Sequence, residues 1–457
     1  MATDNRANVI WVFGDQHRAQ ALGYEGDPNV FTPHLDRLAN ESLLPSGIGG
    51  CPLCSPYRGS LLTSRYPHDA VPGHEEPLPA DLPTVATAFN DAGYDTAWFG
   101  KWHVGGIKEA EGRSALRTVP KELRGGFRTW LGYDNNNSQY DCPIHGHEAD
   151  GTEVAHERLR GYETDALTDM LIELIRRHGK TKGGDGADGT TGDGAPFFAG
   201  LSVQPPHDPY TAPPEFMAQH NAGSIEFREN VPAVAWVREI AARELAGYYA
   251  MIENLDWNVG RIRDALEDAG LTEDTHIIFF SDHGEMHGSH GQFRKTNPYE
   301  EAIRVPMIVG GTTPYYGTLR GRSDLLFNHV DLAPTSLGLA GVPVPDWMAG
   351  TDYSAARVSG GGPAPDYPDS AYIQLVHPTG HGNSIDRPWR GVVTRDGWKY
   401  VCLEHQPWLL FDLNTDPYEQ VNLAYNTKFA SERKRLHDRL AAWVEETGDS
   451  FALPRLE

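Results

Sequence analysis

The sequence predicts an α/β protein in which a large, mixed and mostly parallel sheet lies between helices and a small sheet-and-helix subdomain follows. Buried strands are expected at residues 8–14 (NVIWVFG), 196–203 and 276–281, because each is a short apolar run rich in branched and aromatic side chains. Polar residues follow the carboxyl end of each strand, where open α/β sheets bind their ligands. The sequence therefore predicts a site along one edge of the sheet.

Hydrophobic spacing predicts the other elements of the large domain. Further strands are expected at 95–99 and 305–310, and helices at 82–92, 166–178 and 241–269, the last interrupted near 254–258. Residues 105–160 are polar and glycine-rich, so we expect a long loop region over the mouth of the site. His145 and His147 in this region are interpreted as solvated loop histidines, with substrate contact as the alternative.

Two stretches poor in apolar residues divide the chain. Residues 183–195 (GGDGADGTTGDGA) cannot bury apolar area and are expected to be a flexible excursion. Residues 359–368 (SGGGPAPDYP) are typical of a linker, which predicts a catalytic domain at 1–358 and a subdomain at 369–457. Within the subdomain we expect antiparallel strands at 391–401 and 408–413 and a helix at 428–446.

Composition limits the partners. The net charge of -24 argues against nucleic acid, and the scattered cysteines, four in number, do not form a disulfide framework. No apolar run is long enough for a membrane span, and the first residues lack the pattern of a signal peptide. The simplest expectation is a cytoplasmic protein without a membrane partner, and the sequence leaves its oligomeric state open.

The segment 51–67, CPLCSPYRGSLLTSRYP, carries the strongest chemical signal. Pro56 suits the first turn of a helix, which would place Cys54 at the helix N-terminus, where free N–H groups favour an anion. A cysteine in that field, with Arg58 four residues later, is a candidate nucleophile. The alternatives are a redox dithiol of Cys51 and Cys54, half of a zinc site, or cysteines without a chemical role.

Further candidates lie at the predicted strand ends. Asp15 follows the first strand and Asp282 a later one, so both are placed to hold a metal ion, although a lone Asp15 would be read as a turn or cap residue. Lys101 and His103 are two residues apart, and in an extended chain both side chains would point the same way. His207 follows another strand within a proline-rich turn, and fixing that turn is its alternative role.

The order Cys-x-Pro-x-Arg, continued as GSLLTSR, resembles the signature of type I sulfatases in the alkaline phosphatase superfamily. The resemblance implies an alkaline phosphatase-like fold and a Cys54 that a formylglycine-generating enzyme oxidises to formylglycine, whose hydrate is the nucleophile. Ser64 stands where the family often has Gly, a small-for-small change.

The resemblance also assigns the remaining site residues. One divalent cation would be held by Asp15, Gln16, Asp282, His283 and the modified Cys54; calcium is the expected ion, with manganese and magnesium as alternatives. Arg58, Lys101 and Lys295 would offset charge on the nucleophile and the sulfuryl group. His103 is the candidate base that releases sulfate, and His207 the candidate acid for the leaving alcohol.

The expected reaction is hydrolysis of a sulfate monoester. Because the chain is acidic, we expect a small basic pocket with a metal ion to attract the substrate, and a small or carbohydrate sulfate ester rather than a densely sulfated polymer. The alternatives are a phosphonate or phosphate-diester hydrolase of the same superfamily, and a non-catalytic binding protein with unmodified Cys54.

Overall fold

The computed structural model describes residues 6–183, 194–311, 320–358, 366–379, 385 and 387–456. Its main sheet consists of β1 (Asn8–Gly14), β2 (Leu43–Ile48), β3 (Asp95–Lys101), β4 (Thr129–Tyr133), β5 (Pro143–His147), β6 (Glu153–Arg158), β7 (Phe197–Val203), β8 (Thr275–Ser281), β9 (Arg304–Val305), β10 (Met307–Gly310) and β11 (Gly321–Asn328). The strand order is β11-β2-β10-β8-β1-β7-β3-β4-β5-β6, with β9 paired to β2. The mixed, mostly parallel sheet that the sequence predicted is confirmed.

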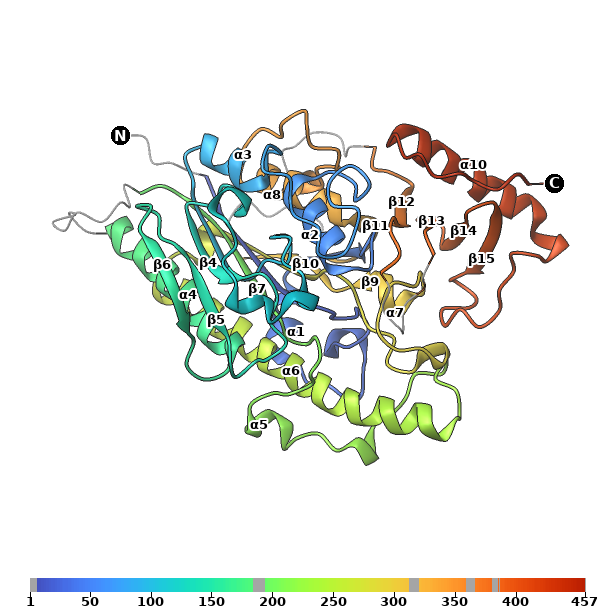
Figure 1. The fold of residues 1–457 in the computed structure, drawn as a ribbon, viewed down its shortest axis with the longest axis horizontal. Coiled ribbons are helices and arrows are strands. Elements are labelled where there is room, and N and C mark those ends of the chain that lie inside the picture. The colour runs from blue at the N-terminus through green and yellow to red at the C-terminus, as the bar shows by residue number, and fades with distance from the viewer. Residues whose placement is uncertain are drawn as a thin grey trace.

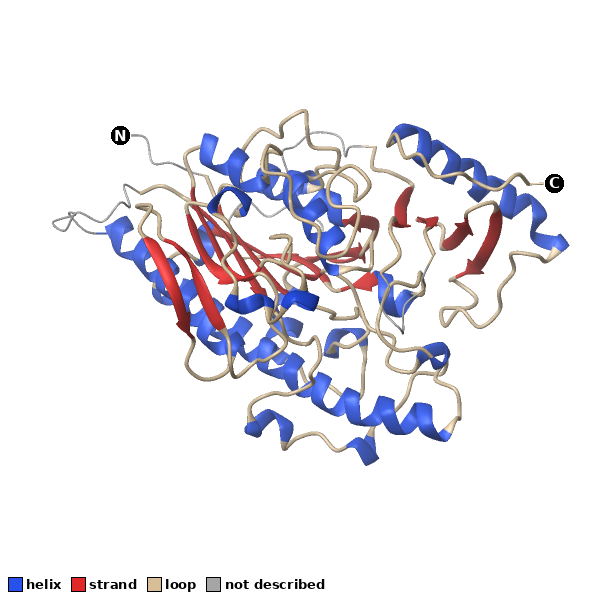
Figure 2. Cartoon of the chain, in the orientation of Figure 1, coloured by secondary structure: helices blue, strands red, loops and turns tan. Residues whose placement is uncertain are grey.

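Helices cover both faces of this sheet (Figures 1 and 2). One core contains side chains of α2 (Cys54–Thr63), α3 (Val85–Asp91) and α8 (Leu332–Leu339), and the other contains side chains of α1 (Pro33–Asn40), α4 (Glu163–Gly183) and α6 (Ala235–Asp268). Every residue of β1 is buried, with Trp11 in the first core and Ile10 in the second. A central strand covered on both faces reads as a continuous apolar run, which is why the sequence located it.

The expected loop region 105–160 contains three strands of the main sheet, so this prediction was wrong in part. β4 pairs with β3, β5 with β4, and β6 with β5. β6 is largely exposed at the sheet edge, and a polar strand there carries little apolar signal. His145 and His147 lie on β5 and are buried, where they bond the Val119 N–H and the Phe127 carbonyl. The interpretation as solvated loop histidines was therefore wrong.

The predicted break in the long helix was also wrong. α6 runs without interruption from Ala235 to Asp268. Asn254 and Asn258 within it donate hydrogen bonds of 2.9 and 2.8 Å to the carboxylate of Asp165 on α4. The polar residues that suggested a break instead join two packed helices.

α3 begins at Val85, later than expected, because the Thr84 side chain caps its N-terminus.

The C-terminal part of the chain forms a separate antiparallel sheet, drawn in orange and red in Figure 1. Its strands are β12 (Ser370–Leu375), β13 (Trp389–Thr394), β14 (Trp398–Leu403) and β15 (Gln406–Asp412), and α10 (Ala430–Glu446) covers one face. The expected strand at 391–401 is two strands, because Gly397 adopts a positive φ of 86° in the turn between them. β12 was not predicted. The remaining short helices are α5 (Pro214–Met217), α7 (Glu300–Ile303) and α9 (Ser354–Arg357).

The smaller sheet packs directly on the large domain. Trp389 and Leu409 share a core with Leu53 and Ile303 of the large domain. Most of the predicted linker (359–365) and of the predicted excursion (184–193) lies outside the described residues, so both remain predictions, as does the domain division. None of the helices in the described ranges combines the length and apolar character needed to cross a membrane.

Candidate active site

The carboxyl ends of the central strands bring two distant carboxylates together. β1 and β8 run parallel with Gly14 opposite Ser281, so the residues that follow each strand lie at one edge of the sheet. There the Gln16 N–H donates to Asp282 Oδ1 at 3.0 Å. The register of two parallel strands thus joins segments more than 260 residues apart.

α2 places Cys54 beside these carboxylates. The helix begins at Cys54, as predicted, and ends at Thr63; Ser64 caps its C-terminus with a left-handed φ of 52°. Ser64 Oγ donates to the Val330 carbonyl at 2.7 Å and accepts from the Gly350 N–H at 3.0 Å. The left-handed backbone suits glycine, whereas the serine hydroxyl adds two contacts that glycine lacks.

Ser64→Ala is expected to destabilise the fold by about 1–3 kcal/mol, because it loses both hydrogen bonds and keeps the strained φ. Ser64→Gly loses the same bonds but relieves about 1 kcal/mol of backbone strain, so it should melt between wild type and Ser64→Ala. Thermal unfolding of the three proteins provides the measurement. An alanine variant as stable as the glycine variant would contradict this account of the position.

Four side chains form a buried cluster that could hold a metal ion: Asp15, Cys54, Asp282 and His283 place ligand atoms within 4.8 Å of one another. His283 Nδ1 lies 3.0 Å from the Gly284 carbonyl, which can only accept, so Nδ1 carries the proton. Its Nε2 lone pair faces Cys54 Sγ at 3.1 Å and Asp15 Oδ1 at 3.6 Å. A neutral imidazole held in this way is the form that binds a cation.

Three cationic side chains surround the same cluster. Lys101 Nζ lies 2.7 Å from Asp15 Oδ2, and Arg58 bridges the two carboxylates at 3.3 Å from each. Lys295 Nζ donates to Gln16 Oε1 at 3.0 Å and to Cys54 Sγ at 3.3 Å. The acidic composition predicts a small basic pocket, and these three cations, set against two carboxylates, form one.

The two carboxylates differ in their ionisation. Burial opposes the charge of Asp15, but the charges of Lys101 and Lys295 hold its pKa well below the ordinary value. Burial and the charge of Asp15 raise the pKa of Asp282 to about 6. Two carboxylates, an amide oxygen and a neutral imidazole suit a hard divalent cation, and such an ion would relieve the repulsion between the carboxylates.

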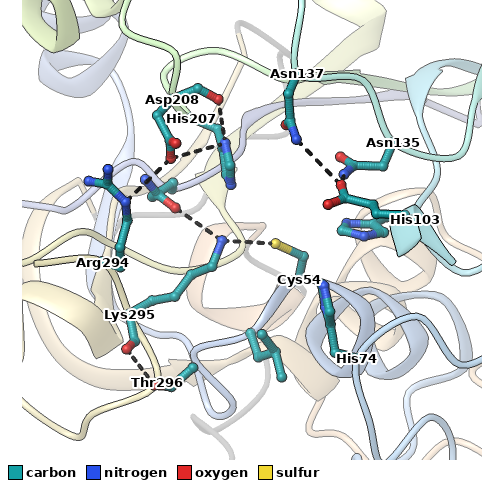
Figure 3. A pocket seen from close by; sticks show the side chains of 13 residues that line it. Cys54, His74, His103, Asn135, Asn137, His207, Asp208, Arg294, Lys295 and Thr296 are labelled. Atoms are coloured by element: carbon teal, nitrogen blue, oxygen red, sulfur yellow. Dashed lines mark hydrogen bonds and ion pairs between the residues drawn. The ribbon is translucent and has the colours of Figure 1, made fainter. Parts of the chain in front are cut away.

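A pocket of about 250 Å³ opens above the cluster. Its lining comprises Gln16, Leu53, Cys54, His74, His103, Glu109, Asn135, Asn137, His207, Asp208, Arg294, Lys295 and Thr296 (Figure 3). Of the predicted residues, Gln16, Cys54, His103, His207 and Lys295 therefore face the pocket. Asp15, Arg58, Lys101, Asp282 and His283 are buried behind that lining and hold one another in place.

The two candidate proton carriers differ in their surroundings. His103 is buried and, among the described residues, neither ring nitrogen has a hydrogen-bond partner. Burial and Lys101 hold its pKa well below the ordinary value, so it is neutral and able to accept a proton. The chain turns at His103 with a φ of 58°, so the expected alternation of an extended strand does not orient it.

His207 is held by its neighbour. Its Nδ1 lies 2.7 Å from the Asp208 carbonyl, so Nδ1 carries the proton, as in His283. Burial and Lys295 lower the pKa of His207 to about 4. Acting as an acid at neutral pH would require anionic charge nearby, which a bound substrate brings.

Sequence reasoning missed several residues of the pocket. Figure 3 shows Asn135 and Asn137 across the pocket from Lys295 and Arg294. Both asparagines belong to region 105–160, which was predicted to lie over the mouth of the site. The prediction therefore gave the position of this region but did not identify the two asparagines as pocket residues. Arg294 binds Glu244 at 3.0 Å and lies beside Lys295 in the chain. No sequence motif identified Arg294 as a residue of the pocket.

The thiol of Cys54 is poorly suited to act as a thiolate. Burial and the Asp15 carboxylate raise its pKa to about 11, and burial raises the pKa of Cys51 as well. Both cysteines are free, and the metal-type clusters found in the described residues include Cys54 but not Cys51. Neither an activated dithiol nor a zinc half-site matches these surroundings.

Models of known protein families match most of this chain. A family model described as Sulfatase matches residues 7–342, most of the chain. The chain belongs to the sulfatase family. A second model, described as N-sulphoglucosamine sulphohydrolase, C-terminal, matches residues 288–446 of this sulfatase.

Named relatives extend the match over nearly the whole sulfatase chain. It is 31% identical over 454 residues to an ulvan-active sulfatase of Formosa agariphila, covering 98% of this chain and 82% of the relative. It is 31% identical over 392 residues to an endo-4-O-sulfatase of Bacteroides thetaiotaomicron, covering 76% of this chain and 72% of the relative. The family and these relatives make the chain a hydrolase of sulfate esters.

A solved structure in complex with its substrate D-glucosamine-2-N,6-O-disulfate shares the fold. Its TM-score is 0.82 at 22% identity, over 97% of this chain and 99% of the other. The alkaline phosphatase-like architecture that the resemblance implied is thereby confirmed.

Proposed function

We propose that this sulfatase hydrolyses a carbohydrate sulfate monoester, using a formylglycine made from Cys54 and one divalent cation. The observation that carries the proposal is the position of Cys54, at the first residue of α2, in contact with His283 and Lys295 and open to the pocket. When present, formylglycine hydrate supplies a hydroxyl nucleophile and the cation supplies a Lewis acid. Asp15, Gln16, Asp282 and His283 are the residues that would hold the cation, with calcium the expected ion.

The surrounding side chains would bind and orient the sulfuryl group. Lys295 faces the pocket and would contact the oxygens of the sulfuryl group. Arg58 and Lys101 add positive charge from behind the carboxylates. His207 would give a proton to the leaving alcohol oxygen as the S–O bond breaks. His103, whose ring nitrogens have no partner among the described residues, would take the proton of the hydrate's second hydroxyl, so that the carbon–oxygen bond to sulfate breaks and the aldehyde forms again.

The pocket wall favours a sugar over an aryl or alkyl ester. As far as the structure describes the lining, Leu53 is its one aliphatic side chain, and it contains no Phe, Tyr or Trp. An aryl group needs apolar surface, whereas sugar hydroxyls match amides, carboxylates and imidazoles. The two relatives named for ulvan and for endo-4-O-sulfatase activity add support.

A rate comparison tests the proposal. Protein made together with a formylglycine-generating enzyme, with the modification verified by peptide mass spectrometry, is assayed on sugar, aryl and alkyl sulfates and on phosphate diesters. We expect the highest kcat/KM on a sugar sulfate. Preference for a diester would overturn the substrate assignment in favour of the related phosphonate and diester hydrolases.

Lys295→Met is expected to lower the turnover of sulfate esters by roughly a hundred- to thousand-fold, mainly in kcat, because a contact to the transferring group strengthens in the transition state. Lys399→Met is the matched control. Lys399 is fully buried and paired with two carboxylates, whereas Lys295 is half-buried at the pocket, and Lys399 lies in the C-terminal sheet. Lys399→Met should reduce the stability of the fold and leave kcat near the wild-type value. Equal effects of the two changes on kcat would argue against a catalytic role for Lys295.

A further inference from the structure

A second cavity adjoins the active-site pocket. It has a volume of about 400 Å³ and is lined by Glu109, Gly112, Arg113, Ser114, Asn135, Asn137 and Ser138. Three of these residues, Glu109, Asn135 and Asn137, also line the pocket that contains Cys54. The two spaces therefore meet along a shared wall, and a ligand larger than one sugar could extend from one into the other. We refer to the second space as the side cavity.

Two residues that line the side cavity, Ser114 and Asn135, each contain a buried polar atom without a partner among the described residues. Within the described part of the chain, Asn135 Oδ1 and Ser114 Oγ make no hydrogen bond, although these residues are only 5% and 2% exposed. The Asn135 amide is oriented by its nitrogen, which donates to the Glu109 carboxylate. The oxygen is therefore left as an acceptor. A buried acceptor without a partner is unfavourable unless a ligand or water supplies a donor.

This acceptor defines the ligand chemistry. A hydroxyl group can donate to Asn135 Oδ1, whereas a sulfate or carboxylate group has no proton to donate. The exposed Glu109 carboxylate repels a second anion at the junction of the two spaces. Arg113 is the one cation in the described lining, and the Asp141 carboxylate and the Asn136 amide oxygen already bind it. Among the described lining residues, none has an apolar side chain.

We propose that the side cavity is a second subsite, which binds an uncharged, hydroxyl-rich sugar unit next to the sulfated one. The inference rests on the proposed sulfatase function and specifies its substrate: an oligosaccharide in which the neighbouring unit carries no sulfate. Asn135 and Ser114 bond the hydroxyl groups of that unit. Glu109 discriminates against a charged unit in the same place.

The first test compares two substrates that share one sulfated unit. One is the sulfated monosaccharide with the highest turnover, and the other is the same unit joined to an unsulfated hexose. Wild type should prefer the disaccharide by about tenfold in kcat/KM, as expected from one or two added hydrogen bonds. Ser138→Trp, which fills the side cavity, should abolish this preference. Ser431→Trp, at an exposed position of α10, should retain it.

The outcomes separate the two proposals. Equal kcat/KM for both substrates in wild type, or a preference that survives in Ser138→Trp, overturns the subsite while leaving the sulfatase function intact. Absence of turnover of any sulfate ester by verified formylglycine protein overturns the proposed function itself.

The second test adds a sulfate to the neighbouring unit. Wild type should turn over this disulfated disaccharide less efficiently than the monosulfated one. Glu109→Gln should reduce the discrimination by roughly threefold to fivefold, the size expected for two charges a few ångströms apart in water. Glu111→Gln is the matched control, since Glu111 lies outside both linings and pairs with Arg117. Wild-type preference for the disulfated substrate, or an unchanged ratio in Glu109→Gln, would contradict the role of Glu109.

Discussion

Cys54→Ala is expected to lower sulfate-ester turnover by on the order of a millionfold, the size typical when an enzyme loses its nucleophile. The physical reason is that no other group in the described pocket lining is placed to replace it. Cys54 Sγ lies 3.1 Å from His283 Nε2 and 3.3 Å from Lys295 Nζ. The measurement is kcat/KM on the best sugar sulfate, with circular dichroism to confirm the fold.

Cys51→Ala provides the matched control for Cys54→Ala. Cys51 is also buried and free, but it belongs to the core shared with the C-terminal sheet and does not line the pocket. This variant should retain turnover. Peptide mass spectrometry of active wild type should find formylglycine at residue 54 and an intact thiol at residue 51. Active protein with an intact Cys54 thiol would show that the proposed mechanism is wrong.

Asp282→Asn is expected to remove the bound cation and lower turnover by roughly a thousandfold or more, because a Lewis acid contributes several kcal/mol to such a reaction. Asp282 is central to the cluster, since it accepts the Gln16 N–H and binds Arg58. The substitution keeps the shape of the side chain and removes its charge. Elemental analysis of the metal-loaded protein measures the cation independently of activity.

The control for this loss is another buried aspartate, Asp256→Asn. Asp256 on α6 accepts the N–H groups of His34 and Leu35 and lies outside the metal-type cluster. It should reduce stability without releasing the metal. Stoichiometric metal in Asp282→Asn, or equal loss in both variants, would rule out the assigned cation site.

The sequence determined the elements and residues whose signals are local. Buried strands such as β1 and β8 are continuous apolar runs, and a parallel pair places the residues after each strand at one edge. That rule, together with the family resemblance, brought Asp15 and Asp282 together in the prediction. Likewise Pro56 in the first turn located the start of α2 and thus placed Cys54.

Signals that depend on distant partners misled the prediction. The polar residues Asn254 and Asn258 suggested a break in a helix, because their partner Asp165 lies on another helix. The strands between residues 129 and 158 were missed, since a strand at a sheet edge is defined by pairing more than by composition.

Tertiary structure alone decided how the site is supported. Trp389 of β13 donates to the Thr296 carbonyl at 2.9 Å, and the Thr296 N–H donates to the Pro52 carbonyl. The C-terminal sheet thereby holds the loop that carries Lys295, a contact that spans 93 residues. The side cavity likewise arises where the segments around residues 109–114 and 135–138 meet. A local pattern determines which side chains can react, whereas only long-range packing determines which of them share one space.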